Sequence, residues 1–136
     1  METLFSLFEK YTGARPSQHR LLAGSGSNRV YYRLWNDDKT YIGVHGTDIK
    51  ENNAFLVLSE QMASCGINVP QVLAVSNNKS DYLLSDLGDE SLFFEHIAKG
   101  FDDTTVTLLH KTIAQLPKIQ FEVAKYLDFS VCYPQA

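Results

Sequence analysis

Apolar residues near the start of the chain recur at helical spacing. Leu4, Phe5, Phe8 and Tyr11 fall on one side of a helix, and Gly13 follows them. Glycine readily adopts the left-handed conformation that ends many helices. The chain is therefore expected to open with one amphipathic helix that ends at Gly13.

The spacing of apolar residues then changes to one typical of strands. Residues 20–44 contain three runs of β-branched and aromatic residues, separated by a glycine and serine segment at 24–27 and a turn sequence at 36–39. Two further runs, 69–76 and 81–85, are joined by a turn sequence rich in Asn and Ser. The pattern predicts a five-stranded antiparallel sheet.

Helix signals return between the third and fourth strands. Asp48 occupies an N-cap position with Glu51 three residues later, an apolar stretch covers 54–62, and Gly66 supplies a stop. This segment is expected to be the main helix of the sheet region, so the predicted fold class is α+β.

The last third of the chain is expected to be helical. Ser91 can cap a helix that runs to about Lys99, with Gly100 after it. A second helix is expected over 104–116, ending before Pro117, because proline lacks the N–H that an interior helical residue donates.

Size and charge restrict the function classes. The 136 residues have a formal net charge of −4, and the basic residues are scattered, which argues against a nucleic-acid partner. No signal peptide or long apolar span is present, so no membrane partner is expected. Cys65 and Cys132 are far apart and outside metal-ligand spacing, and a reduced, cytoplasmic protein fits best.

The loop after the first strand is the strongest candidate for binding chemistry. It comprises Gly24, Ser25, Gly26, Ser27 and Asn28. Small residues at this spacing let backbone N–H groups approach a phosphate. The alternative is a tight hairpin in which glycine supplies only a positive φ.

Taken together, the order of elements and several short motifs resemble a known family. The motifs are Ser27-Asn28-Arg29, Tyr31-Tyr32-Arg33-Leu34, Val69-Pro70 and Leu83-Leu84-Ser85-Asp86-Leu87-Gly88-Asp89. Over about residues 20 to 100 the chain resembles the amino-terminal lobe of the aminoglycoside phosphotransferase and choline kinase family, which has a protein-kinase-like fold. Within it, the branch that phosphorylates amino sugars in cell-wall recycling is most similar. The resemblance implies an ATP-binding lobe at 1–88, and a hinge with the start of a truncated helical C-lobe at 89–136.

This resemblance assigns the loop at 24–28 to the ATP phosphates and Glu51 to the helix glutamate that pairs with a strand-three lysine in kinases. Glu51 also fits a capping box that needs no nucleotide. The third strand offers no lysine in Tyr41-Ile42-Gly43-Val44-His45. Arg33 could supply the positive charge instead, or it is an ordinary exposed arginine.

The hinge is the remaining candidate nucleotide contact. The resemblance places Leu84, Ser85 and Leu87 against adenine, with backbone contacts from Ser85 and Leu87. The alternative is a buried sheet edge followed by a turn.

Neither catalytic nor metal-binding residues are identified. The kinase catalytic loop contains a His-x-Asp run. None of the four histidines has an aspartate two residues later: His19, His45, His96 and His110. Single histidines are more often surface or core residues than ligands. ATP is the expected cofactor, with Mg²⁺ bound only in the presence of the missing C-lobe.

The functional hypothesis is the ATP-binding lobe of a phosphotransferase that acts on a hydroxyl of a sugar, amino sugar or aminoglycoside-like substrate. The hydroxyl acceptor would bind through the absent lobe, and the chain is expected to be inactive alone. The alternative is a non-catalytic nucleotide-binding or protein-interaction module. An apolar stripe on the last helix could mediate self-association: Leu108, Leu109, Ile113 and Leu116.

Overall fold

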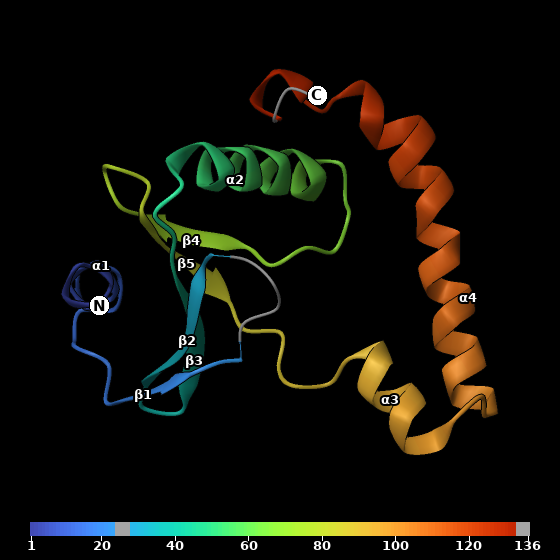
Figure 1. Ribbon diagram of the computed structural model, residues 1–136, viewed down its shortest axis with the longest axis horizontal. Coiled ribbons are helices and arrows are strands. Elements are labelled where there is room, and N and C mark those ends of the chain that lie inside the picture. The colour runs from blue at the N-terminus through green and yellow to red at the C-terminus, as the bar shows by residue number, and fades with distance from the viewer. Residues whose placement is uncertain (24–27, 133–136) are drawn as a thin grey trace. The chain divides into compact units, whose positions relative to one another are not determined.

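The computed structural model describes residues 1–23 and 28–132 (Figure 1). The chain divides into two units, Met1–Asp86 with the segment from Asp128 onward, and Leu87–Leu127. Each unit is described by itself below. The boundary expected at residues 88/89 stays a prediction.

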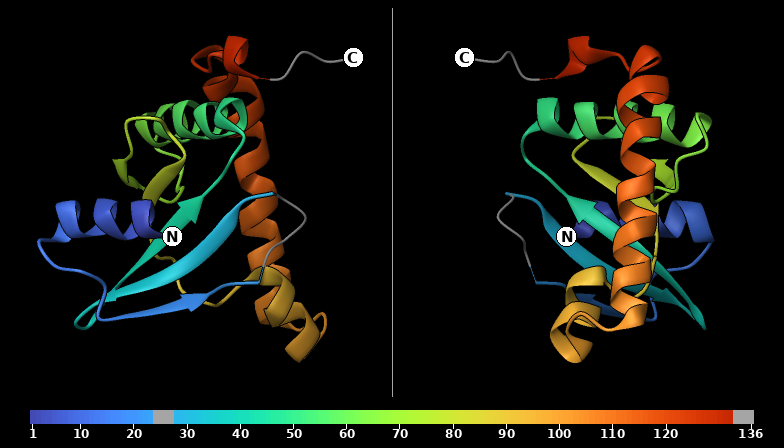
Figure 2. Two further views of the ribbon diagram at one scale, coloured as in Figure 1. Left: turned by 60° about the vertical axis from the view of Figure 1, so that its left-hand side comes forward. Right: turned by 90° about the vertical axis from the view of Figure 1, so that its right-hand side faces the viewer.

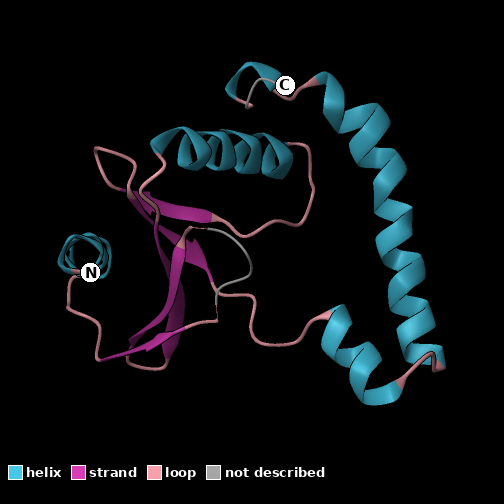
Figure 3. Ribbon diagram, in the orientation of Figure 1, coloured by secondary structure: helices cyan, strands magenta, loops and turns pink. Residues whose placement is uncertain are grey.

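Five antiparallel strands form one sheet in the first unit, as the apolar pattern predicts (Figure 3). In sheet order they are β1 (Gln18–Leu21), β2 (Val30–Asn36), β3 (Lys39–His45), β5 (Asp81–Ser85) and β4 (Val72–Val75). The β2–β3 hairpin is the longest pairing and runs from the Val30–His45 pair to the Asn36–Lys39 turn (Figure 2). The predicted α+β class with a five-stranded sheet is confirmed.

One face of the sheet packs on α1 (Glu2–Thr12), which ends at Gly13 with φ of 86° as expected. Leu4 and Phe8 are fully buried against Leu34 of β2 and Leu83 of β5. Burial of large apolar side chains is the main stabilising term of such a contact. This helix therefore forms one layer of the hydrophobic core.

The opposite face packs on α2 (Ile49–Ser64). Leu56 and Phe55 contact a second cluster that contains Val44, Tyr82 and Leu84. The Asp48 cap is confirmed, because its Oδ1 accepts a hydrogen bond from the backbone N–H three residues later at 3.0 Å. The sheet thus lies between two helices in a three-layer unit.

The second unit contains α3 (Leu92–Lys99) and α4 (Asp103–Pro117), capped by the side chains of Ser91 and Asp102. The expectation that helix ends before Pro117 is wrong. A π-helical turn (Lys118–Glu122) and a 3-10 turn (Val123–Lys125) follow directly. Proline removes one N–H donor, and a wider turn lets the chain stay helical past it.

One short element completes the description. A 3-10 turn (Phe129–Val131) returns to the first unit, where the backbone N–H of Asp128 donates to Gln61 of α2. None of the described helices is both long and apolar enough to cross a membrane.

Candidate functional site

The sheet face that packs on α2 carries the residues relevant to the nucleotide hypothesis, and we call it the α2 face. Side chains alternate between the faces of a strand. Tyr31 and Ile42 pack against the same cluster as Val44 and Leu84, so these residues mark the α2 face. Arg33 lies two residues after Tyr31 on β2 and shares that face.

Most of the predicted phosphate loop, comprising Gly24, Ser25, Gly26 and Ser27, lies outside the described residues. Asn28 is described and is exposed, two residues before β2 begins. The assignment of these five residues to a phosphate stays a prediction.

Glu51 makes one contact through its backbone and another through its side chain, and its role toward a nucleotide stays a prediction. Its backbone N–H is held by the Asp48 cap, while its carboxylate forms an ion pair with Arg29, with 2.9 Å between Oε1 and Nη2. The same Nη2 donates to the backbone carbonyl of Glu51 at 3.1 Å. The guanidinium lies 5.2 Å from the centre of the Phe55 ring, a distance typical of a cation–π contact. Arg29 therefore ties the residues after the glycine loop to the first turn of α2.

A buried tyrosine lies beside the Arg29 and Phe55 contact. Phe55 stacks on Tyr82, which is fully buried on the α2 face. Burial raises the pKa of Tyr82 to about 12, against the opposing effect of the Arg29 charge. The phenol is therefore neutral near pH 7, and Glu51 supplies a carboxylate that pairs with Arg29.

Arg33 forms a second ion pair, with Asp86 at the end of β5. Nε and Nη2 donate to the two carboxylate oxygens at 2.6 and 3.0 Å, and the side chains are only 8% and 6% exposed. The reading of Arg33 as an ordinary exposed arginine is wrong. Paired strands place Arg20 of β1 directly opposite Arg33, so a second positive charge lies beside it.

The third strand contributes no lysine or arginine at the end where it pairs with Val30. Its one lysine, Lys39, pairs with Asn36 at the turn end of the hairpin, whereas Val30 pairs with His45 at the opposite end. On the α2 face β3 instead presents Ile42 and the buried Val44. The positive charges of this face come from β1, β2 and the loop end.

The predicted hinge residues are divided between the two units. Leu84 is buried in the α2-face cluster. Ser85, at the end of β5, bonds to the residue just before β4: its N–H donates to the Gln71 carbonyl and its hydroxyl accepts from the Gln71 N–H, both at 2.9 Å. Leu87 is 70% exposed and belongs to the second unit. Their contact with adenine stays a prediction.

Asn52 positions α2 and was missed in the sequence. It is fully buried, and its Nδ2 donates to the carbonyls of Gly46 at 2.9 Å and Lys79 at 2.8 Å. A Cβ on Gly46 would come within 2.5 Å of the Asn52 Oδ1. Asparagine is a poor interior helix residue, which was the available signal that its side chain bonds elsewhere.

The histidines and cysteines form no metal centre among the described residues. His45 contacts the buried carboxylate of Asp81, with 2.8 Å between Nδ1 and Oδ1. Cys65 and Cys132 are free thiols. The described residues therefore contain no cluster of three or more His, Cys, Asp or Glu side chains that could hold a metal ion.

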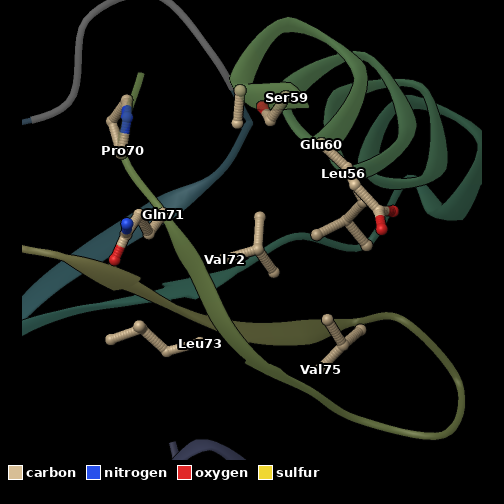
Figure 4. Close-up of a pocket in the computed structure, with 9 residues that line it drawn as sticks. Leu56, Ser59, Glu60, Pro70, Gln71, Val72, Leu73 and Val75 are labelled. Carbon is tan, nitrogen blue, oxygen red and sulfur yellow. The ribbon is translucent and has the colours of Figure 1, made fainter. Parts of the chain in front are cut away.

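A pocket of about 410 Å³ lies between α2 and β4 (Figure 4). Leu56 and Ser59 line it from the helix, and Pro70, Gln71 and Val72 from the strand side. None of the predicted nucleotide contacts among the described residues lines this pocket, and neither do Arg29, Arg33 and Asp86 of the ion pairs.

Comparison with known proteins supports the fold. No family model and no curated protein sequence matches the chain. A crystal structure described as "Putative fructosamine-3-kinase" from Haemophilus somnus 129PT is similar, with a TM-score of 0.55 and 20% sequence identity. The fold is that of a kinase-like N-lobe.

The similarity covers 88% of this chain but 39% of the Haemophilus protein. The chain thus spans about two fifths of the length of the protein that it matches. At this level of identity the comparison establishes the architecture, and the chemistry has to be argued from the residues of the α2 face.

Proposed function

We propose that this chain is the nucleotide-binding lobe of a small-molecule phosphotransferase that acts on a hydroxyl of a sugar or amino sugar. Two lines of support are the kinase-like fold and the similarity to a protein named as a fructosamine kinase. The aminoglycoside phosphotransferase and choline kinase family, which the motifs resemble, fits the same reaction class. ATP is the proposed phosphoryl donor, with Mg²⁺ as its counter-ion.

The observation that carries the proposal is the orientation of Glu51. Its side chain turns from α2 toward the end of the glycine loop, where it forms an ion pair with Arg29. In kinases a glutamate on this helix orients a cation that contacts the phosphates. A carboxylate that served only as part of a capping box would bond back to its own helix start.

Catalysis is proposed to need residues beyond this lobe. Phosphoryl transfer depends on a base and metal ligands that position the nucleophile and neutralise charge. The sequence has no His-x-Asp run, and the described residues form no metal-ligand cluster. The chain is therefore expected to bind ATP without transferring its phosphate.

An NMR titration of the 136-residue chain with ATP and Mg²⁺ tests the proposal. Amide shifts are expected at α2-face residues such as Tyr31 and Val44, and no ADP is expected to form with sugar acceptors present. Unchanged spectra at millimolar ATP would overturn nucleotide binding, and turnover at a kinase-like rate would overturn the need for a further lobe.

A second candidate function is a non-catalytic interaction module. The observation in its favour is the apolar Val44, buried on β3 where a kinase would carry a cation. The module would associate through the partly exposed Ile113 and Leu116 of α4. Defined dimers in sedimentation analysis together with no nucleotide binding would favour it.

A further inference from the structure

We propose that Arg29 is the phosphate-contacting cation of this lobe, positioned by Glu51, and that it replaces a strand-three lysine. The inference rests on the proposed nucleotide-binding function and names the residue that would recognise the phosphates. The first step is the α2 face of β3, which presents Ile42 and Val44 in place of a cation. The charge has to come from another element.

The second step compares Arg29 with Arg33, a cation of the α2 face that lies on β2. Arg33 is bound by both oxygens of Asp86, and both side chains are almost fully buried. Its position is set by a structural carboxylate at the end of β5. Arg29 directly precedes β2 at the end of the loop, and its partner is the α2 glutamate.

The third step is the chemistry of the group. A guanidinium has five N–H donors on a planar fork, and this shape can bind a carboxylate and a phosphate together. The backbone carbonyl of Glu51 and the Phe55 ring further restrict the Arg29 side chain, which is 11% exposed. A cation held in this way loses little further freedom when a phosphate binds.

The fourth step is an unsatisfied donor nearby. Among the described residues, the fully buried hydroxyl of Tyr82 has no hydrogen-bond partner. Buried polar groups without partners are rare. Because this phenol is neutral near pH 7, it adds no negative charge that would repel a phosphate.

Titration of the full chain with ATP and with adenosine, each with Mg²⁺, tests the role of Arg29. Arg29→Ala is expected to weaken ATP binding about tenfold or more and to leave adenosine binding nearly unchanged, because a charge-assisted contact is lost. Arg29→Lys keeps the charge and should restore part of the ATP affinity. Glu51→Gln should weaken ATP binding less than Arg29→Ala, since it removes only the positioning group.

Arg15→Ala is the matched control, because Arg15 forms ion pairs only with the exposed Glu2 and Glu9 among the contacts described. Its ATP affinity should equal that of the unmodified chain. If Arg29→Ala does not fold, the double variant Arg29→Gln with Glu51→Gln removes both charges of the pair and serves in its place.

Three results would contradict the inference. Equal ATP affinity in the unmodified chain and Arg29→Ala would overturn the role of Arg29 while nucleotide binding stands. Equal losses for ATP and adenosine would show a purely structural ion pair. Failure of the unmodified chain to bind either ligand would overturn the proposed function itself.

Discussion

The two units of this chain are built in different ways. In the first, apolar side chains far apart in the sequence meet on both faces of a sheet, as Leu4 does with Leu83. In the second, Val123 is the one buried apolar residue described, and Phe93 and Phe101 of the same unit are 65% and 75% exposed. The sheet unit is therefore held by long-range packing, whereas the helical unit depends on local signals.

The largest expected effect on stability comes from the buried ion pair between Arg33 and Asp86 in the first unit. Arg33→Ala should lower the free energy of unfolding by about 3–5 kcal/mol, because it leaves the Asp86 carboxylate buried without its main partner. Chemical denaturation measures the loss. Arg15→Ala, which removes an exposed arginine from the same unit, should cause little change, and equal effects of the two variants would refute the distinction.

A pair of truncations compares the two units directly. Leu83→Ala should cost about 2–5 kcal/mol, because the residue is fully buried between α1 and the sheet. Ile113→Ala on α4 should change stability by less than about 0.5 kcal/mol, because the side chain is 58% exposed. Thermal unfolding of both variants checks the contrast. A large loss of stability in Ile113→Ala would show that this side chain is buried in a contact and would contradict the prediction.

A smaller effect is expected where α1 meets the sheet. A Cβ at Gly43 would lie 2.8 Å from Leu34 Cδ1 and 3.0 Å from Leu4 Cδ2, both in fully buried side chains. Gly43→Ala should therefore cost about 1–3 kcal/mol through overpacking. The double variant with Leu4→Ala should recover part of this cost, and simple additivity of the two losses would contradict the packing explanation.

The smallest effect concerns the local signals of the second unit. The backbone N–H of Thr105, which donates to the Asp102 carboxylate at 2.7 Å, lowers the pKa of Asp102. Because the pKa is lowered in the folded state, the cap stabilises α4 fully at a pH above the pKa of Asp in the unfolded chain, about 4. This stabilisation is lost as the pH falls below that value and the carboxylate is protonated. Far-ultraviolet circular dichroism should show helix loss below about pH 4. Asp102→Asn, which caps without titrating, should reduce that pH dependence. If helix content depends on pH in this variant as it does in the unmodified chain, other groups cause the helix loss.

Features of the fold could be predicted where neighbouring residues along the chain determine them. The Asp48 cap, the left-handed Gly13 and the five strands follow from short-range patterns, so they were predictable. The helical turns after Pro117 were not, because the sequence predicts a break there and cannot show that a wider turn replaces it.

The candidate site shows the same limit at a finer scale. Glu51 was singled out by its position on the helix, yet its partner Arg29 was not, because 22 residues separate the two. Arg33 was noted for its face on β2, and only the fold brings the Asp86 carboxylate onto both of its donors.

The sequence by itself therefore determined the order of elements and the helix caps, since these depend on neighbours along the chain. The tertiary structure decided which charges meet. A sheet with order β1-β2-β3-β5-β4 and a helix across one face bring residues 22 and 53 positions apart into two ion pairs. Those pairings require the whole sheet, because no local interaction can specify them.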